Sequence, residues 1–169
     1  MQADFPSRGR ILAVDFGTVR IGLAICDPQW ILASPLDVVS VGKDKAKQET
    51  AFRKIIDEQR VDACVVGLPI HCDGGESEKS RECRKFALWL QDISNRPVRL
   101  FDERFTTSAA KRRMSDRKLS KQGKKKRLDA VAALVLLESF LEACRYHDKI
   151  MGQQPGDPAD GDASLHDPI

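Results

Sequence analysis

The first third of the chain alternates short apolar runs with turn residues, which is the pattern of short strands. The apolar runs predict three strands, at about 11–15, 20–26 and 30–39. Ser34-Pro35 interrupts the third run, and because proline removes a hydrogen-bond donor, that strand should lie at a sheet edge or carry a bulge. With such short connections, the three strands are most simply an antiparallel meander.

Farther along, the apolar period changes to that of helices. Helical spacing predicts three longer helices, at about 45–59, 78–94 and 129–144. Asp44 is placed to cap the first of them, and a short helix capped by Thr106 or Thr107 is expected to reach about Met114. Apolar strands alternate with these helices at about 62–69 and 97–101. That order implies parallel crossovers in a sheet covered on both faces.

This order of elements predicts one α/β domain with a five-stranded mixed sheet flanked by helices. Its first three strands should be antiparallel and the later ones joined by parallel crossovers. We expect the domain to span residues 10–150, after a flexible arm at residues 1–9. The tail, residues 151–169, is rich in Pro, Gly and Asp and contains no Lys or Arg. Such a composition buries little apolar surface, so the tail is expected to be disordered.

The composition is that of an ordinary globular protein, with 41% hydrophobic and 31% charged residues. No apolar run approaches the roughly 20 residues of a membrane span, and the N-terminus lacks the core of a signal peptide. Five cysteines without a CxxC pair argue against a disulfide framework or a zinc site. These features predict a cytoplasmic protein that does not bind membranes.

Positive charge is concentrated in one segment, residues 111–127, which we call the basic block. It carries ten Lys or Arg against one acid, so its charge is +9 while the whole chain has only +3. Such a block is usually a solvated surface loop. It also suits contact with a phosphate backbone, and its place between two acidic motifs favours that second interpretation.

Three acids stand where this fold would gather them. Asp15 ends the first strand, Glu103 follows the fifth, and Asp129 begins the last helix. Ligand sites in open α/β sheets form at the carboxyl ends of parallel strands, and carboxylate oxygens suit Mg²⁺. Two such ions about 4 Å apart activate a water and stabilise the leaving oxygen in phosphodiester cleavage.

Each acid also has a simpler interpretation. Asp129 could cap its helix, Glu103 could pair with Arg104, and Asp102 could serve in place of Glu103. For Asp15 a structural role is the weaker interpretation, because a carboxylate at the mouth of a buried strand is costly unless paired or bound to metal. His71 is more simply a loop residue than a ligand.

Several motifs, in order, resemble those of a known family. They are Asp15-Phe16-Gly17-Thr18-x-x-Ile21-Gly22, Val66-Gly67-Leu68-Pro69, Asp73-Gly74, Asp102-Glu103-Arg104 followed by Thr107, and Leu128-Asp129-x-x-Ala132-Ala133 with Leu137-Glu138-Ser139. Over about residues 10–145 this set is similar to the YqgF (RuvX) family of ribonuclease H-like nucleases, which are described as pre-16S rRNA processing nucleases and Holliday junction resolvases. The resemblance implies a ribonuclease H-like fold with Asp15, Glu103 and Asp129 as metal-binding catalytic acids. His71-Cys72 departs from the Asn that family members often have after Gly-Leu-Pro.

Our leading hypothesis is therefore a metal-dependent endonuclease with Mg²⁺ or Mn²⁺, in two ions, as cofactor. The preferred substrate is the 5′ end of pre-16S rRNA, with a four-way DNA junction as the alternative. Phosphate contacts are expected from residues near the acids and in the basic block: Thr18, Arg20, Arg104, Lys124, Lys125, Lys126 and Arg127. Recognition would depend on shape and on salt rather than on sequence.

Two other classes of function compete with this hypothesis. Asp-x-Gly-Thr also resembles the phosphate loop of actin-like ATPases and sugar kinases, but those proteins need two such domains, for which 169 residues are too few. A non-catalytic RNA-binding factor would explain the basic block but not the acids. The nuclease hypothesis allows a monomer or a weak homodimer: a symmetric junction cut favours two active sites, hence a dimer, whereas processing of one rRNA end needs only one.

Overall fold

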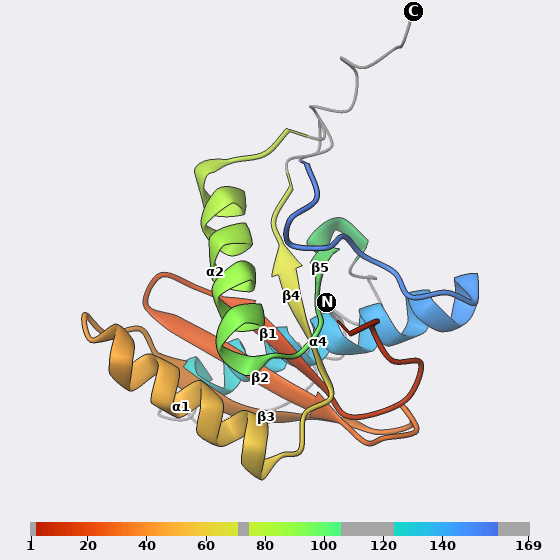
Figure 1. The fold of residues 1–169 in the computed structure, drawn as a ribbon, viewed down its shortest axis with the longest axis horizontal. Coiled ribbons are helices and arrows are strands. Elements are labelled where there is room, and N and C mark those ends of the chain that lie inside the picture. Colours follow the sequence, from red (N-terminus) through yellow and green to blue (C-terminus); the bar gives the residue numbers. More distant parts are fainter. Residues whose placement is uncertain (1–2, 71–74, 106–123, 159–169) are drawn as a thin grey trace, which may run out of the picture.

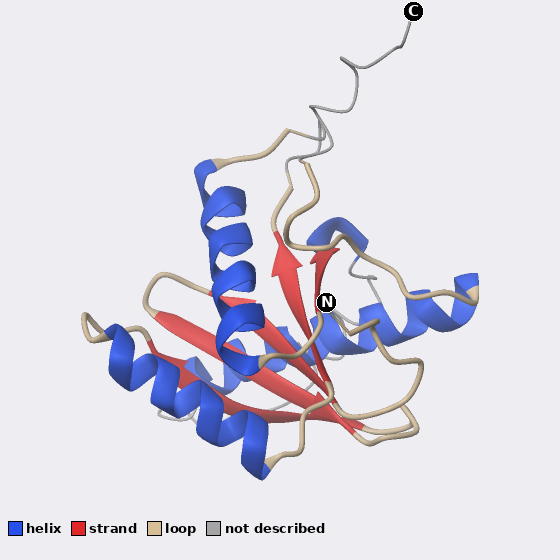
Figure 2. Ribbon diagram, in the orientation of Figure 1, coloured by secondary structure: helices blue, strands red, loops and turns tan. Residues whose placement is uncertain are grey.

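Residues 3–70, 75–105 and 124–158 are described by the computed structural model, and they form one mixed sheet between helices (Figure 1, Figure 2). In chain order the elements are β1 (Ile11–Phe16), β2 (Arg20–Cys26), β3 (Ala33–Ser40), α1 (Lys45–Glu58), β4 (Ala63–Leu68), α2 (Glu78–Ser94), β5 (Val98–Asp102), the 3₁₀ turn η1 (Glu103–Phe105) and α4 (Lys124–His147). The short helix expected to end near Met114, and His71, lie outside the described residues.

The strand order in the sheet is β3-β2-β1-β4-β5. β1 pairs antiparallel with β2, and β2 with β3, whereas the β1–β4 and β4–β5 pairs are parallel. The carboxyl ends of β1, β4 and β5 therefore meet at one end of the sheet. This topology confirms the predicted five-stranded mixed sheet.

The third strand lies at the sheet edge and is irregular, as its proline predicts. Pro35 falls within β3, and the β2–β3 register shifts between Leu23 and Ala24. The predicted start of this strand near residue 30 is wrong. Residues 27–32 form a turn in which Asp27 Oδ1 accepts the amides of Ile31 and Leu32, at 2.8 and 2.6 Å. The strand begins only after that turn, at Ala33.

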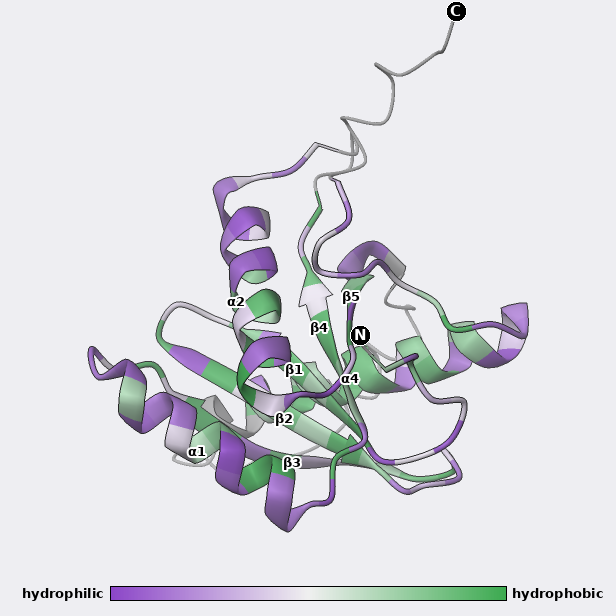
Figure 3. Ribbon diagram, viewed as in Figure 1, coloured by the Kyte–Doolittle hydropathy of each residue, from purple (hydrophilic) through white to green (hydrophobic). Residues whose placement is uncertain are grey.

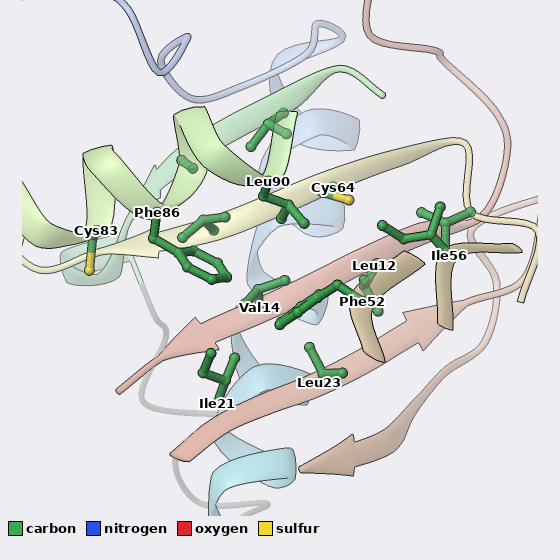
Figure 4. Packing of buried hydrophobic residues seen from close by; sticks show 14 of the residues in the cluster. Leu12, Val14, Ile21, Leu23, Phe52, Ile56, Cys64, Cys83, Phe86 and Leu90 are labelled. Atoms are coloured by element: carbon green, nitrogen blue, oxygen red, sulfur yellow. The ribbon is translucent and has the colours of Figure 1, made fainter. Parts of the chain in front are cut away.

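Helices cover the two faces of the sheet unequally. Helices α1 and α2 lie on one face and α4 on the other, and the apolar sides of all three turn inward (Figure 1, Figure 3). Alternate residues of each strand serve the two cores: Leu12 and Val14 pack with Phe52 and Phe86 under α1 and α2 (Figure 4). Ile11 and Ala13 face α4 instead. This alternation fixes which strand-end residues meet α4.

Helix α4 is longer than the sequence pattern predicts. It begins at Lys124, five residues before Asp129, so its first turn comes from the basic block. Most of its residues from Ala130 to Cys144 are buried against the sheet. Within the described parts of the chain, no helix has both the length and the apolar character needed to cross a membrane.

The N-terminal segment packs more closely than the expected flexible arm. Phe5 is buried, with the centre of its ring 5.7 Å from that of Phe140 and 5.4 Å from the Arg99 guanidinium. The carbonyl of Gly9 accepts the indole N–H of Trp30 at 2.9 Å. Residues 3–9 therefore differ from the expectation, because one aromatic side chain anchors a segment that is otherwise polar.

The first part of the expected disordered tail is also packed. Residues 151–158, which we call the C-terminal strap, run beside β5, and Leu100 and Gln153 exchange two backbone hydrogen bonds of 2.8 Å. Pro155 is buried there. The expectation of disorder from residue 151 onward thus fails for the strap, because the outer edge of β5 supplies hydrogen bonds that its composition could not reveal. Residues 159–169 lie outside the described part of the chain.

Candidate active site

Asp15 stands near the carboxyl end of β1 and faces α4. Ile11 and Ala13, four and two residues earlier, belong to the α4 core, so strand alternation directs Asp15 to the same face. Directly opposite in the antiparallel pair lies Gly22 of β2. A Cβ at Gly22 would overlap the backbone carbonyl of Asp129, so this glycine lets α4 approach the sheet beside Asp15.

Glu103 reaches the same face from η1. A Cβ on Gly67 of β4 would lie 2.7 Å from Glu103 Oε1 and 3.4 Å from the side chain of Leu136 in α4. Glu103 therefore lies between the end of β4 and α4. Because Gly67 has no side chain, it leaves the space that the Glu103 side chain occupies.

Asp102, the alternative to Glu103, is engaged elsewhere. Its carboxylate accepts the backbone amide of Arg104 at 2.8 Å and the Arg104 side chain at 2.7 and 2.9 Å. The Asp102 side chain is thus occupied by Arg104, while Glu103 and Asp15 are close enough for the charge of Asp15 to act on Glu103. The geometry favours Glu103 over Asp102 as the partner of Asp15.

The acids affect each other electrostatically. Burial is the main cause that raises the pKa of Asp15, and the charge of Asp129 raises it further. Burial likewise raises the pKa of Glu103, followed by the charge of Asp15. Lys79, in the first turn of α2, lowers the pKa of both carboxyls without cancelling these effects. Burial together with the neighbouring carboxylates therefore outweighs the effect of Lys79 on both pKa values.

Asp129 is not the cap of α4, since the helix begins five residues earlier. Its carboxylate instead accepts Arg20 Nε at 2.7 Å, in a pair whose Asp129 and Arg20 side chains are 30% and 39% exposed. Such a half-exposed ion pair contributes on the order of 0–1 kcal/mol to the free energy of unfolding, so little free energy is needed to rearrange it. Arg20, expected to contact phosphate, is thus placed beside an acid of the site.

The donor set suits a hard divalent cation, since it consists of carboxylate oxygens close enough that the charge of Asp129 raises the pKa of Asp15 and the charge of Asp15 raises that of Glu103. Across residues 3–70, 75–105 and 124–158, no three His, Cys, Asp or Glu side chains are already gathered closely enough to hold an ion. Asp129 would have to turn from Arg20 toward Asp15 for all three carboxylates to share one. The carboxylate chemistry of these residues fits a metal, while their arrangement in this structure does not yet form a closed ligand set.

The remaining predicted contact residues lie around the acids. Thr18 is exposed in the β1–β2 turn, and Arg104 is exposed beside Asp102. Lys124, Lys125, Lys126 and Arg127 form the backbone of the first turn of α4. The rest of the basic block lies outside the described residues.

Sequence reasoning missed Lys79 as part of this site. The loop after β4 is tied to α2 by Ser80, whose hydroxyl donates to the Pro69 carbonyl and whose amide bonds to Ser77 Oγ at 3.2 Å. This capping arrangement places the first turn of α2 near the strand ends, so that the charge of Lys79 reaches Asp15 and Glu103. A Ser-x-x-Ser cap after an apolar strand was the available signal.

Cysteine chemistry plays no part in the described site. Cys26, Cys64, Cys83 and Cys144 are free and buried. Burial raises the pKa of Cys64 and of Cys83 to about 12, so both are neutral thiols at physiological pH. These side chains behave as core residues.

The matching family model and the named relatives agree on one family. Residues 9–143 match the family model described as "RuvX: Holliday junction resolvase". A protein of Rhodopirellula baltica named "Putative pre-16S rRNA nuclease" is 55% identical over 163 residues, which cover 96% of this chain and 93% of the relative. One of the same name from Mycobacteroides abscessus is 41% identical over 146 residues, covering 84% and 86%.

A solved structure, Thermus thermophilus RuvC in complex with a Holliday junction substrate, superposes with a TM-score of 0.56 at 13% identity. The match covers 82% of this chain and 96% of that one. At this identity the likeness concerns the fold alone, which is ribonuclease H-like in both proteins.

Proposed function

Because the chain belongs to the RuvX (YqgF) family, we propose that it is a metal-dependent endonuclease that processes the 5′ end of pre-16S rRNA. The observation that carries this proposal is the convergence of Asp15, Glu103 and Asp129 on the α4 face, where burial and neighbouring charge raise the pKa of Asp15 and Glu103. Such crowding of buried carboxylates does not stabilise the folded protein. It is typical of sites that act on a substrate or hold a cation.

Asp15, Glu103 and Asp129 would hold one or two Mg²⁺ or Mn²⁺ ions, which supply an activated water and stabilise the leaving oxygen of a phosphodiester. The chain's own cations then position the substrate. Arg104 stands beside the η1 acid and Arg20 beside the α4 acid, so positive charge flanks the carboxylates on both sides. A phosphate strand lying across the ends of β1 and β5 would meet both guanidinium groups.

Pre-16S rRNA is preferred as substrate because the relatives that cover most of this chain carry that name. The description of the matched family model supports a four-way DNA junction as the second candidate. Since Lys and Arg contacts to phosphate carry no sequence information, both substrates would be recognised by shape. The buried cysteines suit the reducing cytoplasm, where we place the reaction.

The decisive experiment compares the wild type with Asp15→Asn on a labelled pre-16S rRNA fragment and on a four-way DNA junction. Each assay is run with Mg²⁺, with Mn²⁺ and with chelator. We expect cleavage of the rRNA precursor that disappears with chelator and in Asp15→Asn. As a matched control, Asp57→Asn makes the same substitution at an exposed position of α1, on the other face of the sheet, and should cleave normally.

Metal binding gives a readout that does not depend on cleavage. Mg²⁺ should raise the melting temperature of the wild type and of Asp57→Asn but not that of Asp15→Asn, because a ligand of the folded state stabilises it by mass action. Tight, salt-sensitive RNA binding without cleavage, unchanged in Asp15→Asn, would instead favour a non-catalytic binding factor. Cleavage of the junction alone would transfer the proposal to that substrate.

A further inference from the structure

A cavity of about 260 Å³ opens beside the candidate acids, between the end of β5 and the C-terminal strap. Its walls include Asp102 and Arg104 on one side and Met151, Gly152 and Gln153 on the other. Figure 1 shows the strap passing the ends of β4 and β5 next to η1, the element that carries Glu103. The cavity therefore adjoins the site, because two of its lining residues, Asp102 and Arg104, are the sequence neighbours of Glu103.

The strap wall is held in place by specific bonds. Gln153 pairs with Leu100 of β5 through two backbone hydrogen bonds of 2.8 Å, and its side chain accepts Arg84 Nη2 at 2.7 Å. Arg84 in turn forms an ion pair with Glu76, in which both side chains are nearly buried. The wall is thus tied to β5, to α2 and to the loop after β4.

Gly152 allows this close approach. Its φ of +90° is a conformation that residues with a side chain rarely adopt. A Cβ there would lie 2.5 Å from the Leu100 carbonyl oxygen. Any side chain at residue 152 would therefore push the strap away from β5 and deform the cavity.

The lining fits a planar, neutral group better than an anion. Arg104 is fixed by two contacts to Asp102, so its flat guanidinium is presented in one orientation, on which a ring can stack. The thioether of Met151 adds a polarisable apolar surface on the other side. Because Asp102 already neutralises Arg104, this wall has no net positive charge to hold a phosphate inside the cavity, whereas a neutral nucleobase needs none.

We propose that this cavity binds one unpaired nucleobase of the substrate strand, next to the phosphodiester that is cut; this rests on the proposed nuclease function. A base inside a duplex has both edges and faces occupied, so only an unpaired or splayed-out base can enter. The cavity would thereby select substrates with single-stranded nucleotides beside the cut. Stacking of this kind is sequence-tolerant in other proteins, because every base has a flat face.

The test uses the rRNA precursor with each nucleotide flanking the cut replaced in turn by an abasic residue. For wild type, one abasic position should slow cleavage about 10-fold or more, as expected for the loss of one stacked base, and the others should have little effect. In Gly152→Ala that sensitivity should be lost. Gly156→Ala is the matched control, because the same strap glycine substitution there meets no atom within 4 Å, and it should behave like the wild type.

A binding measurement separates this proposal from the nuclease itself. The same RNA, with 2-aminopurine at the sensitive position, is titrated with Asp15→Asn in chelator, so that nothing is cut. Its fluorescence should change on binding, and the change should be absent when Gly152→Ala is added to Asp15→Asn. In Gln153→Ala, which removes the side-chain bond to Arg84 and keeps the backbone pairing with Leu100, the change should be reduced; this variant provides the test if Gly152→Ala does not fold.

Two results would contradict the proposal that this cavity binds a nucleobase. One is a wild type that cleaves the RNA with no abasic position mattering. The other is a 2-aminopurine signal, at every flanking position, that the strap variants leave unaltered. If the wild type gives the fluorescence change but never cleaves, nucleobase binding in the cavity is supported and the proposed nuclease function is wrong.

Discussion

The buried position of the Asp15 carboxyl lowers the stability of the metal-free protein at neutral pH. Its pKa is raised by burial and by the charge of Asp129, so the folded protein binds protons more tightly at this carboxyl than the unfolded chain does. A group of this kind lowers stability as the pH rises from its unfolded pKa through its folded pKa. The same reasoning holds for Glu103, whose pKa is raised by burial and by Asp15. Without metal, the contribution of these two carboxyls to stability should therefore be most favourable on the acidic side of this window.

Asp15→Asn should accordingly stabilise the metal-free protein at neutral pH. We expect a rise in melting temperature on the order of 2–4 °C, which corresponds to ~1 kcal/mol in a domain of this size. The difference should vanish as the pH falls below about 4, where the wild-type carboxyl is protonated in both states. Calorimetry in chelator measures it, with Asp57→Asn as the control that should show no rise. A lower melting temperature for Asp15→Asn at neutral pH would mean that Asp15 is structural.

Gly22 is the residue at which α4 approaches the sheet most tightly beside Asp15. Gly22→Ala would place a methyl group against the carbonyl of Asp129, so α4 would have to move outward beside Asp15. We expect the free energy of unfolding to fall by about 1–3 kcal/mol, as for other overpacked positions, measured by urea denaturation. Gly42→Ala is the control, because the nearest atom to its Cβ is 3.9 Å away. Equal midpoints for the two variants would contradict this placement of α4.

At the scale of elements, Arg84 joins α2 and the loop before it to the strap, which lies 69 residues farther along the chain at Gln153. It contacts Glu76 in the loop before α2, and Gln153 and the carbonyl of Asp157 in the strap. Because this ion pair is nearly buried, removing one partner leaves the other charge without compensation. The loop beside the acids and the strap should therefore loosen together.

Arg84→Met should lower the free energy of unfolding by about 3–5 kcal/mol, the usual cost of breaking a buried pair. Amide hydrogen exchange at Gln153 and Leu100 should accelerate more than exchange in the centre of β1. Arg81→Met, on the exposed side of the same helix, controls for the substitution and should change neither quantity. Unaltered exchange in the strap would show that the backbone pairing with β5 holds it alone.

The elements that sequence patterns predicted are those whose stability is local. Asp44 caps α1 through the amides of Ala46 and Lys47, and the apolar period of α2 matches its buried side; both signals lie within a few residues. The strap was not predictable, because it depends on the open edge of β5, some fifty residues earlier in the chain. The pairing of Asp129 with Arg20 across 109 residues was hidden for the same reason.

For the candidate site, sequence and family resemblance pointed to Asp15, Glu103 and Asp129, and the structure brings all three to the α4 face. Choosing Glu103 over Asp102 needed the Arg104 contacts, which depend on side-chain geometry. For Lys79 the capping signal of Ser77 and Ser80 marks only the start of α2, and its proximity to the acids appears in its charge effect on Asp15 and Glu103. The role of the three acids as catalytic ligands stays a prediction until the substitutions are made.

At the scale of the whole molecule, charge is divided between an acidic body and the basic block. The block has a charge of +9 within a chain of +3. Its last four residues, Lys124 to Arg127, form the first turn of α4. Positive charge at a helix N-terminus opposes the helix dipole, by about 0.3–1 kcal/mol for each exposed group. Four consecutive cations there are unfavourable for folding, which argues for a role in binding.

Replacing Lys124, Lys125, Lys126 and Arg127 by Gln should thus have two effects of opposite sign. The free energy of unfolding should rise slightly, because the helix dipole is no longer opposed. The affinity for RNA should fall, and the slope of log K against log salt should decrease by about 0.7 for each phosphate that the variant no longer neutralises. Lys54→Gln with Lys149→Gln, two exposed lysines on α1 and beyond the end of α4, is the control that should leave the slope unchanged. A stabilised variant with an unaltered salt slope would show that this turn does not contact phosphate, and that binding depends on Arg20, Arg104 and the other residues near the acids.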